Sequence, residues 1–226
     1  MLILSLDTTT ASGSVALLEK TRLLAEMNTE SGSSHSARHL RSVDELLRLN
    51  SLSIKDIDGF AVAAGPGSFT GIRIGLSTAK ALAFASGKPV APVSTLKALA
   101  FKLKDSQVRL ISPILDAKKG EIFAALFESR AKSLEEVIPQ AAYKPDYFLA
   151  GLPAHRLVSF IGNGAEVFKE KIFTYLKDKA RFPSRSPFIA YEVGLLGYEI
   201  LKGGRGKRGE DVQPLYFRRS QAEDKR

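Results

Sequence analysis

The stretch AVAAGPGSFTGIRIG, residues 61–75, joins an expected strand to an expected helix, and the fold assignment depends on it. Glycine-rich turns at such junctions often bind phosphate, because backbone N–H groups and the helix dipole converge there. This turn lacks the Lys-Ser/Thr pair of a Walker A loop, and its third glycine falls one position late for a dinucleotide-binding fingerprint. The spacing therefore favours a tight corner over a phosphate site. The residues of the turn are Gly65, Pro66, Gly67, Ser68, Phe69, Thr70 and Gly71.

Outward from this turn, the hydrophobic pattern predicts strands that alternate with helices. Before the turn, the expected elements are strands at 2–6, 15–18 and 23–27, a helix at 36–50 and a strand at 57–64. After it, they are a helix at 72–86, a strand at 90–93 and a helix that ends near residue 103. Gly87 should end the first of these helices, and Ser94 should cap the second.

A similar pattern begins again at residue 108. The expected strands lie at 108–116, 121–128 and 156–162, and the expected helices at 165–175 and 187–201. The segment PILDAKKGEIFAALFE (113–128) also resembles LSLDTTTASGSVALLE (4–19), since each has a strand ending in Asp, a polar turn and a returning strand. A three-strand meander followed by alternating helices, present twice, predicts a duplicated α/β fold of two βββαβα-type halves, residues 1–105 and 106–226.

The composition is that of a soluble globular protein. The 226 residues are 44% hydrophobic and 25% charged, and no apolar run approaches the roughly 18 to 20 residues that span a bilayer. The N-terminus has neither the basic region nor the cleavage site of a signal peptide. The absence of cysteine excludes disulfides, thiolate metal sites and thiol nucleophiles. We therefore expect a cytoplasmic protein with no membrane partner.

The net charge of +9 is partly concentrated near the end of the chain. Residues 202–226 contain eight Lys or Arg and four Asp or Glu, and so contribute +4. Within them, GGRGKRG (203–209) is basic and glycine-spaced, which predicts a mobile segment. It is either a solvated tail or a salt-sensitive contact with an acidic partner or RNA.

Asp7, Thr8 and Thr9 form the best candidate group for carboxylate and hydroxyl chemistry. A carboxylate at a strand end, beside hydroxyls, can hold the water shell of Mg²⁺ and phosphate oxygens. Asp7 can equally cap the turn through hydrogen bonds to nearby backbone groups. Both alternatives remain open from the sequence.

His35 and His39 stand four residues apart on one helix face, as two zinc ligands would. They lack the acidic neighbour of an H-E-x-x-H motif, and His155 is the only other histidine. The pattern therefore favours solvated or interface histidines. No acid–base pair, triad or metal cluster emerges elsewhere, so the sequence predicts neither a catalytic centre nor a metal site.

Six segments, in this order over nearly the whole chain, resemble the TsaB (YeaZ) family. The GPGSFTG-x-R-x-G element is the most specific of them. The resemblance implies a duplicated ASKHA fold, named for its actin-like, Hsp70-like and sugar-kinase-like members. The six segments are ILSLDTTT, HSARHL, AAGPGSFTGIRIGLSTAKALA, PVSTLKALA, DAKKGEIFAALF and QPLYFRRSQAE.

The resemblance further implies a non-catalytic relative of TsaD, the subunit that transfers the threonylcarbamoyl group. TsaB-like proteins bind TsaD and, with TsaE, support the formation of N6-threonylcarbamoyladenosine beside the anticodon of tRNA. The expected partners are thus TsaD and TsaE, a second copy of the chain as an alternative, and tRNA through the complex. We expect no cofactor for the isolated chain, and ATP with Mg²⁺ for the assembled complex.

TsaD-like proteins carry a metal-binding His-x-x-x-His motif, which falls on Thr95 and Leu99 of this chain. Neither residue supplies an imidazole, so the resemblance implies that the catalytic metal site is absent. Two alternatives from other classes are an ATP-binding enzyme, either kinase-like or peptidase-like, and a protein that binds tRNA directly. The hairpin at Asp7–Thr9 matches the ATP-binding hairpins of this fold, with GNGAE (162–166) as the only glycine-rich counterpart.

The same resemblance places the partner interface on the helices at 36–50 and 72–86. Periodicity alone does not separate interface positions from core positions on these helices. The predicted interface residues are His35, Arg38, His39, Ile72, Arg73, Leu76, Ala79, Lys80 and Ala83.

Overall fold

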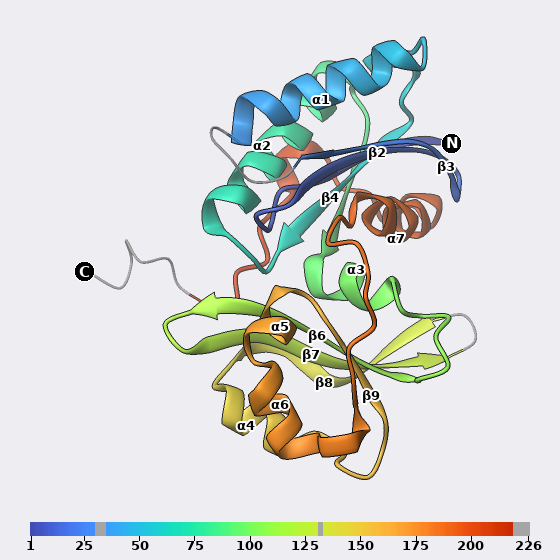
Figure 1. The fold of residues 1–226 in the computed structure, drawn as a ribbon. Helices are drawn as coiled ribbons and strands as arrows, with labels where there is room; N and C mark the ends of the chain where they lie inside the picture. The colour runs from blue at the N-terminus through green and yellow to red at the C-terminus, as the bar shows by residue number, and fades with distance from the viewer. Residues whose placement is uncertain (30–34, 131–132, 219–226) are drawn as a thin grey trace. The chain divides into compact units, whose positions relative to one another are not determined.

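The computed structural model describes residues 1–29, 35–130 and 133–218, with residues 35–38 described as backbone only. Contacts divide the chain into two compact units (Figure 1). The first unit comprises Met1–Ala98 and Phe188–Tyr216, and the second comprises Leu99–Pro187 together with Phe217 and Arg218.

The first unit is built on a five-stranded sheet of order β3-β2-β1-β4-β5. β1, β2 and β3 form an antiparallel meander, while β4 and β5 continue the sheet in parallel with β1. β1 is buried along almost all of its length because it is central and is covered on both faces. The strands are β1 (Leu2–Asp7), β2 (Gly13–Glu19), β3 (Arg22–Thr29), β4 (Gly59–Gly65) and β5 (Val90–Ser94).

Helices cover both faces of this sheet (Figure 1). Leu4, Leu6 and Phe60 belong to the core under α1 and α2, whereas the alternate strand residues Ala16 and Leu18 pack with α7. The elements are α1 (His35–Leu49), the short 3-10 helix η1 (Ile54–Asp56), α2 (Phe69–Ser86), α3 (Thr95–Phe101), α7 (Ala190–Lys202) and the 3-10 helix η3 (Gly209–Asp211). α3 begins in the first unit and ends in the second.

α7 lies close against the sheet because two of its positions are glycine. A Cβ on Gly194 or Gly197 would overlap the side chains of Leu18 or Ala61. The hydroxyl of Ser5 donates to the carbonyl oxygen of Ala190 at 2.7 Å.

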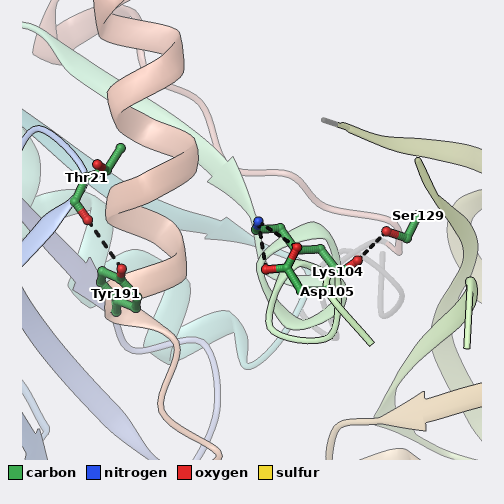
Figure 2. A network of polar contacts seen from close by, with 5 residues as sticks. All are labelled: Thr21, Lys104, Asp105, Ser129 and Tyr191. Atoms are coloured by element: carbon green, nitrogen blue, oxygen red, sulfur yellow. Dashed lines mark hydrogen bonds and ion pairs between the residues drawn. The ribbon is translucent and has the colours of Figure 1, made fainter. Parts of the chain in front are cut away.

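The start of α7 is also fastened to the meander. The Tyr191 hydroxyl donates to the carbonyl oxygen of Thr21 at 3.3 Å (Figure 2). The two units therefore differ from the predicted halves, 1–105 and 106–226, in two ways. α7 belongs to the first unit, and the boundary between the units falls within α3.

The second unit repeats the topology of the first. Its sheet has the order β10-β9-β6-β7-β8, so that three antiparallel strands are again followed by two parallel ones. The strands are β6 (Leu110–Lys118), β7 (Glu121–Arg130), β8 (Ser133–Tyr143), β9 (Val158–Ile161) and β10 (Ala180–Arg181). The helices are α4 (Pro145–Ala150), α5 (Asn163–Val167), α6 (Lys169–Leu176) and the 3-10 helix η2 (Lys177–Lys179). The repeated strand order confirms the predicted duplication.

Within the second unit, the Ser129 hydroxyl donates to the carbonyl oxygen of Lys104 (Figure 2). The ammonium group of Lys104 is paired with the adjacent carboxylate of Asp105 at 2.9 Å. The hydrogen bond from Ser129 fastens the segment after α3 to the end of β7.

Several element boundaries differ from the sequence prediction. α2 begins at Phe69, three residues early, because Ser68 caps it and accepts a hydrogen bond from the amide of Gly71. The helix expected at 165–175 is divided into α5 and α6 at Phe168, and the last helix begins at Ala190. The predicted stop at Gly87 is confirmed by its left-handed φ of 69°.

The segment GGRGKRG, which the sequence predicted to be mobile, is held in the first unit. The amide and carbonyl groups of Lys207 pair with those of Val90 at 2.8 Å each. Val212 is fully buried, and the Leu215 amide donates to Ala64 of β4 at 2.7 Å. The glycines allow the segment to lie close to β5 and α2, and this contact fixes it. None of the described helices is long and apolar enough to cross a bilayer.

Candidate protein interface

The glycine-rich loop between β4 and α2 packs against the hairpin that follows β1. The Thr8 hydroxyl donates to the carbonyl oxygen of Gly71 at 2.7 Å, and the Ser68 amide donates to the carbonyl oxygen of Thr9 at 2.8 Å. A Cβ on Gly67 would overlap the carbonyl of Thr9, and one on Gly71 would overlap that of Thr8. The loop needs glycine at these positions because two segments of backbone are in contact there.

Three amides of this loop form hydrogen bonds within the chain. The Ser68 amide bonds to Thr9, the Gly71 amide to the Ser68 hydroxyl at 3.2 Å, and the Ile72 amide to the Ser68 carbonyl at 2.8 Å. A phosphate site requires such donors to point at the ligand. The geometry therefore agrees with the tight-corner interpretation of the sequence.

Asp7 is fully buried below this loop. One carboxylate oxygen accepts hydrogen bonds from the Thr9 amide at 2.9 Å and the Thr9 hydroxyl at 2.6 Å. These are the bonds that the turn-capping alternative requires. Burial raises the pKa of Asp7 from 3.8 to about 6, although the two bonds from Thr9 oppose the rise.

GNGAE, the glycine-rich counterpart in the second unit, also packs on its own sheet. A Cβ on Gly162 would overlap the carbonyl oxygen of Ile114, and one on Gly164 would lie 2.7 Å from the carbonyl carbon of Leu115. These glycines thus permit α5 to approach β6.

Thr95 and Leu99, the positions of the TsaD histidine motif, lie on α3 and are both buried. The Ser94 hydroxyl accepts from the Lys97 amide at 3.2 Å, as the predicted cap requires. Among the described residues, no three His, Cys, Asp or Glu side chains gather closely enough to hold a metal ion.

Most of the predicted interface residues on α2 belong to the core of the first unit. Ile72, Leu76, Ala79 and Ala83 are buried, because a spacing of three and four residues turns them all toward the sheet. A charged side chain at Leu76 or Ala83 would therefore be placed in the core. Their assignment to a surface is corrected accordingly.

Arg73, on the outer side of α2, supports the end of the first unit. Its Nε donates to the Tyr216 hydroxyl at 3.2 Å, and the Tyr216 ring lies 4.9 Å from that of Phe69. Arg73 therefore fastens the C-terminal segment of the unit to the start of α2. Lys80, further along α2, is half-buried.

On α1, the structure corrects one prediction and leaves two unaddressed. His39 is only 2% exposed, so it is neither solvated nor available as a surface contact. The His39 side chain faces the interior of the unit, whereas the next residue, Leu40, is exposed. The side chains of His35 and Arg38 lie outside the described residues.

A largely apolar groove of about 860 Å³ lies among α1, η1 and α2. Val43 and Leu47 are buried at its base, whereas Leu40 is 52% exposed. We call this feature the α1–α2 groove. Its lining residues are Leu40, Arg41, Val43, Asp44, Leu47, Arg48, Leu52, Ser53, Ile54 and Leu82.

The groove lies between the two helices on which the sequence analysis placed a partner interface, but none of the described residues predicted there lines it. Leu82 lines the groove, and Phe84 is 92% exposed beyond it. The apolar residues at 72, 76, 79 and 83 repeat every three or four positions, which predicts that this face of α2 is buried. Phe84 follows the last of these positions and so lies outside the buried face. That periodicity was the signal available in the sequence.

Known proteins similar to this chain identify its family. Residues 27–194 match the family described as TsaD: tRNA N6-adenosine threonylcarbamoyltransferase. The chain is 32% identical to the tRNA threonylcarbamoyladenosine biosynthesis protein TsaB of Bacillus subtilis, over 100% of this chain and 97% of that protein. The chain belongs to the TsaB family. Its GPGSFTG element and its full-length match to a TsaB protein confirm the resemblance seen in the sequence.

Solved structures extend the TsaB assignment to the fold. A crystal structure from Pseudomonas aeruginosa, described as an uncharacterized protein with similarity to peptidase YeaZ, has a TM-score of 0.83 and 27% identity. The match covers 96% of this chain and 99% of that one. The ROK hexokinase of Thermus thermophilus has a TM-score of 0.51 at 12% identity, over 90% and 100% of the two chains, and is similar in fold alone. The duplicated ASKHA fold is confirmed.

Proposed function

We propose that this chain is a non-catalytic subunit that binds a TsaD-like threonylcarbamoyltransferase. In this role it supports the formation of N6-threonylcarbamoyladenosine beside the anticodon of tRNA. The observation that carries the proposal is the full-length similarity to TsaB of Bacillus subtilis. The match of residues 27–194 to the TsaD family agrees with a common ancestor for this chain and its proposed partner.

Three local features support an accessory role over an ATP-binding or peptidase-like enzyme. Three of the loop amides bond within the chain, Asp7 is enclosed, and Thr95 and Leu99 replace imidazole ligands. A catalytic site needs a nucleophile, base or metal ligand that can reach a substrate. The retained fold then serves to present a surface to a partner.

The α1–α2 groove is the surface that we assign to the TsaD-like partner. Its base is apolar, and its rim carries Arg41, Asp44 and Arg48. An apolar centre with a polar rim is the usual anatomy of a protein interface. Burial of the half-exposed Leu40 against an apolar helix of the partner would stabilise the complex by about 25 cal/mol for each Å² of apolar surface removed from water.

The proposal includes the remaining components of the pathway. TsaE joins the assembled complex, tRNA binds to that complex, and ATP with Mg²⁺ is used there and not by this chain alone. A second copy of the chain can occupy the same groove when the TsaD-like partner is absent. The location is cytoplasmic, where tRNA is modified.

The groove assignment is tested by Leu40→Glu. A half-exposed helical position accepts glutamate without loss of fold, while a carboxylate at the apolar centre of an interface must lose its water. We expect affinity for the TsaD-like protein of the same organism to fall at least tenfold, measured by isothermal titration calorimetry. Leu157→Glu, at another exposed leucine, is the matched control and should leave that affinity unchanged.

The function itself is tested by purifying the tagged chain from its native source and identifying the proteins that accompany it. Recovery of a TsaD-like subunit in roughly equal amount is the expected result. Unchanged affinity in Leu40→Glu would reject the groove, whereas purification without any TsaD-like subunit would reject the proposed function.

A further inference from the structure

A second surface of the first unit combines cations with an exposed aromatic ring. The end of α2, the turn between α2 and β5, and the segment 206–210 enclose a pocket of about 530 Å³. Lys80, Lys88, Lys207 and Arg208 line this pocket together with Phe84. We call it the basic pocket.

Backbone contacts hold the segment 206–210 beside α2 and β5. Lys207 is fixed by its two bonds to Val90, the residue that begins β5. Gly209 lies against α2, where its Cβ would be 3.3 Å from the carbonyl oxygen of Lys80. The segment is therefore one wall of the pocket.

The positive charge of the pocket is largely uncompensated. Lys80, Lys88 and Lys207 form no ion pair within the described part of the chain. Arg208 is paired with Glu210 at 2.9 Å and with Asp211 at 3.0 Å. Three lysines thus remain for an anionic ligand, beside one acidic residue of the lining, Glu210, which Arg208 neutralises.

Phe84 supplies the second element of recognition. Its side chain is 92% exposed, and no ring contact involves it among the described residues. An aromatic ring among cations is the combination with which proteins bind single-stranded nucleic acid, because bases stack on the ring while cations contact the phosphates. Duplex nucleic acid offers only its phosphates to such a surface.

We propose that the basic pocket binds an unpaired segment of RNA, with a base on Phe84 and phosphates on Lys80, Lys88 and Lys207. This inference deepens the proposed function, on which it rests for the identity of the RNA as the anticodon loop of tRNA. It assigns to this chain a direct contact with the substrate of the complex.

The test uses the full chain without partner proteins and a fluorescein-labelled anticodon stem-loop RNA, followed by fluorescence anisotropy over a range of salt concentrations. We expect the triple variant K80Q/K88Q/K207Q to bind at least tenfold more weakly at about 0.1 M salt. The slope of log affinity against log salt should fall by about 2, since each phosphate contact contributes roughly 0.7 to 0.9. K20Q/K55Q/K119Q, which removes three exposed lysines elsewhere, is the matched control and should bind as the unchanged chain does.

Phe84→Ala separates base stacking from charge. It should weaken binding of the stem-loop about fivefold or more, because the base loses its stacking on the aromatic ring. Binding of a fully paired RNA of equal length should not change.

If the two triple lysine variants lost RNA affinity equally, the assignment of RNA binding to the basic pocket would be rejected. It would also be rejected if the unchanged chain did not bind the RNA at low salt. Equal effects of Phe84→Ala on the stem-loop and the paired RNA, or no effect on either, would overturn the stacking. Leu40→Glu should retain RNA binding, so failure of the pocket and failure of the TsaD-like interaction are distinguishable.

Discussion

Asp7 is a carboxylate without access to solvent, and its position makes the ionised form costly in the folded state. Its pKa rises from 3.8 to about 6 because burial disfavours the charge more than Thr9 stabilises it. Below pH 3.8 the carboxyl is protonated in both the folded and the unfolded states. Between pH 3.8 and about 6, the unfolded chain has lost this proton while the folded state still holds it. The free energy of unfolding therefore decreases as the pH rises across this range, and above it the decrease is complete.

Asp7→Asn should remove this pH dependence. We expect the free energy of unfolding of the variant, minus that of the unchanged chain, to be about 2 kcal/mol higher at about pH 7.5 than at about pH 4. Urea unfolding at the two pH values measures the difference. Ser5→Ala, which removes a buried hydroxyl that does not titrate in this range, is the control and should change the free energy of unfolding equally at the two pH values. A difference for Asp7→Asn that is independent of pH would contradict the assignment.

At the scale of elements, the contact between the glycine-rich loop and the hairpin after β1 positions α2. Gly71 touches the Thr8 carbonyl, and Gly75, one turn later, would place a Cβ 2.6 Å from the Thr8 hydroxyl. The start of α2 can therefore reach the hairpin only while these positions lack side chains.

Gly71→Ala should destabilise the chain by about 1 to 3 kcal/mol, because the added methyl group must displace backbone. Gly151→Ala is the matched control, since its nearest neighbour would lie 3.5 Å away in ordinary contact. Thermal unfolding compares the two variants. Equal midpoints would show that the loop and the hairpin adjust without cost.

The elements also show how far sequence reasoning extends. The central strands were predicted because both of their faces are buried and their apolar runs are continuous. β8 was missed because it is an edge strand, with Glu135, Glu136 and Pro139 in its sequence, and edge strands tolerate charge and proline. The buried positions on α2 could not be assigned to core or interface, since periodicity identifies an apolar face without saying what covers it.

At the scale of the whole molecule, the first unit depends on residues from both ends of the chain. α7 covers one face of the first sheet, and Ser5 and Ser14 bond to the backbone of Ala190. An apolar helix can pack against either of two sheets, and its hydrophobic pattern does not distinguish them. The sequence therefore could not assign α7 to the first unit.

A fragment of residues 1–105 should therefore not fold cooperatively. Without α7 the face of the sheet around Ala16, Leu18 and Ala61 stays in water. Hydrogen exchange should show unprotected amides in β1 and β4 of this fragment, and addition of a fragment of residues 188–216 should restore protection. Cooperative unfolding of 1–105 by itself would contradict the division described here.

The return of α7 to the first sheet also has a consequence during synthesis on the ribosome. Roughly 90 residues separate Ala98 from Phe188, and translation at about 5 to 20 residues per second takes roughly 5 to 18 s to add them. Throughout that interval the nascent first sheet has no covering helix on one face. Residues 99–187, the larger part of the second unit, are made before that cover emerges, so the sheet that is synthesised first keeps one apolar face in water while they are added.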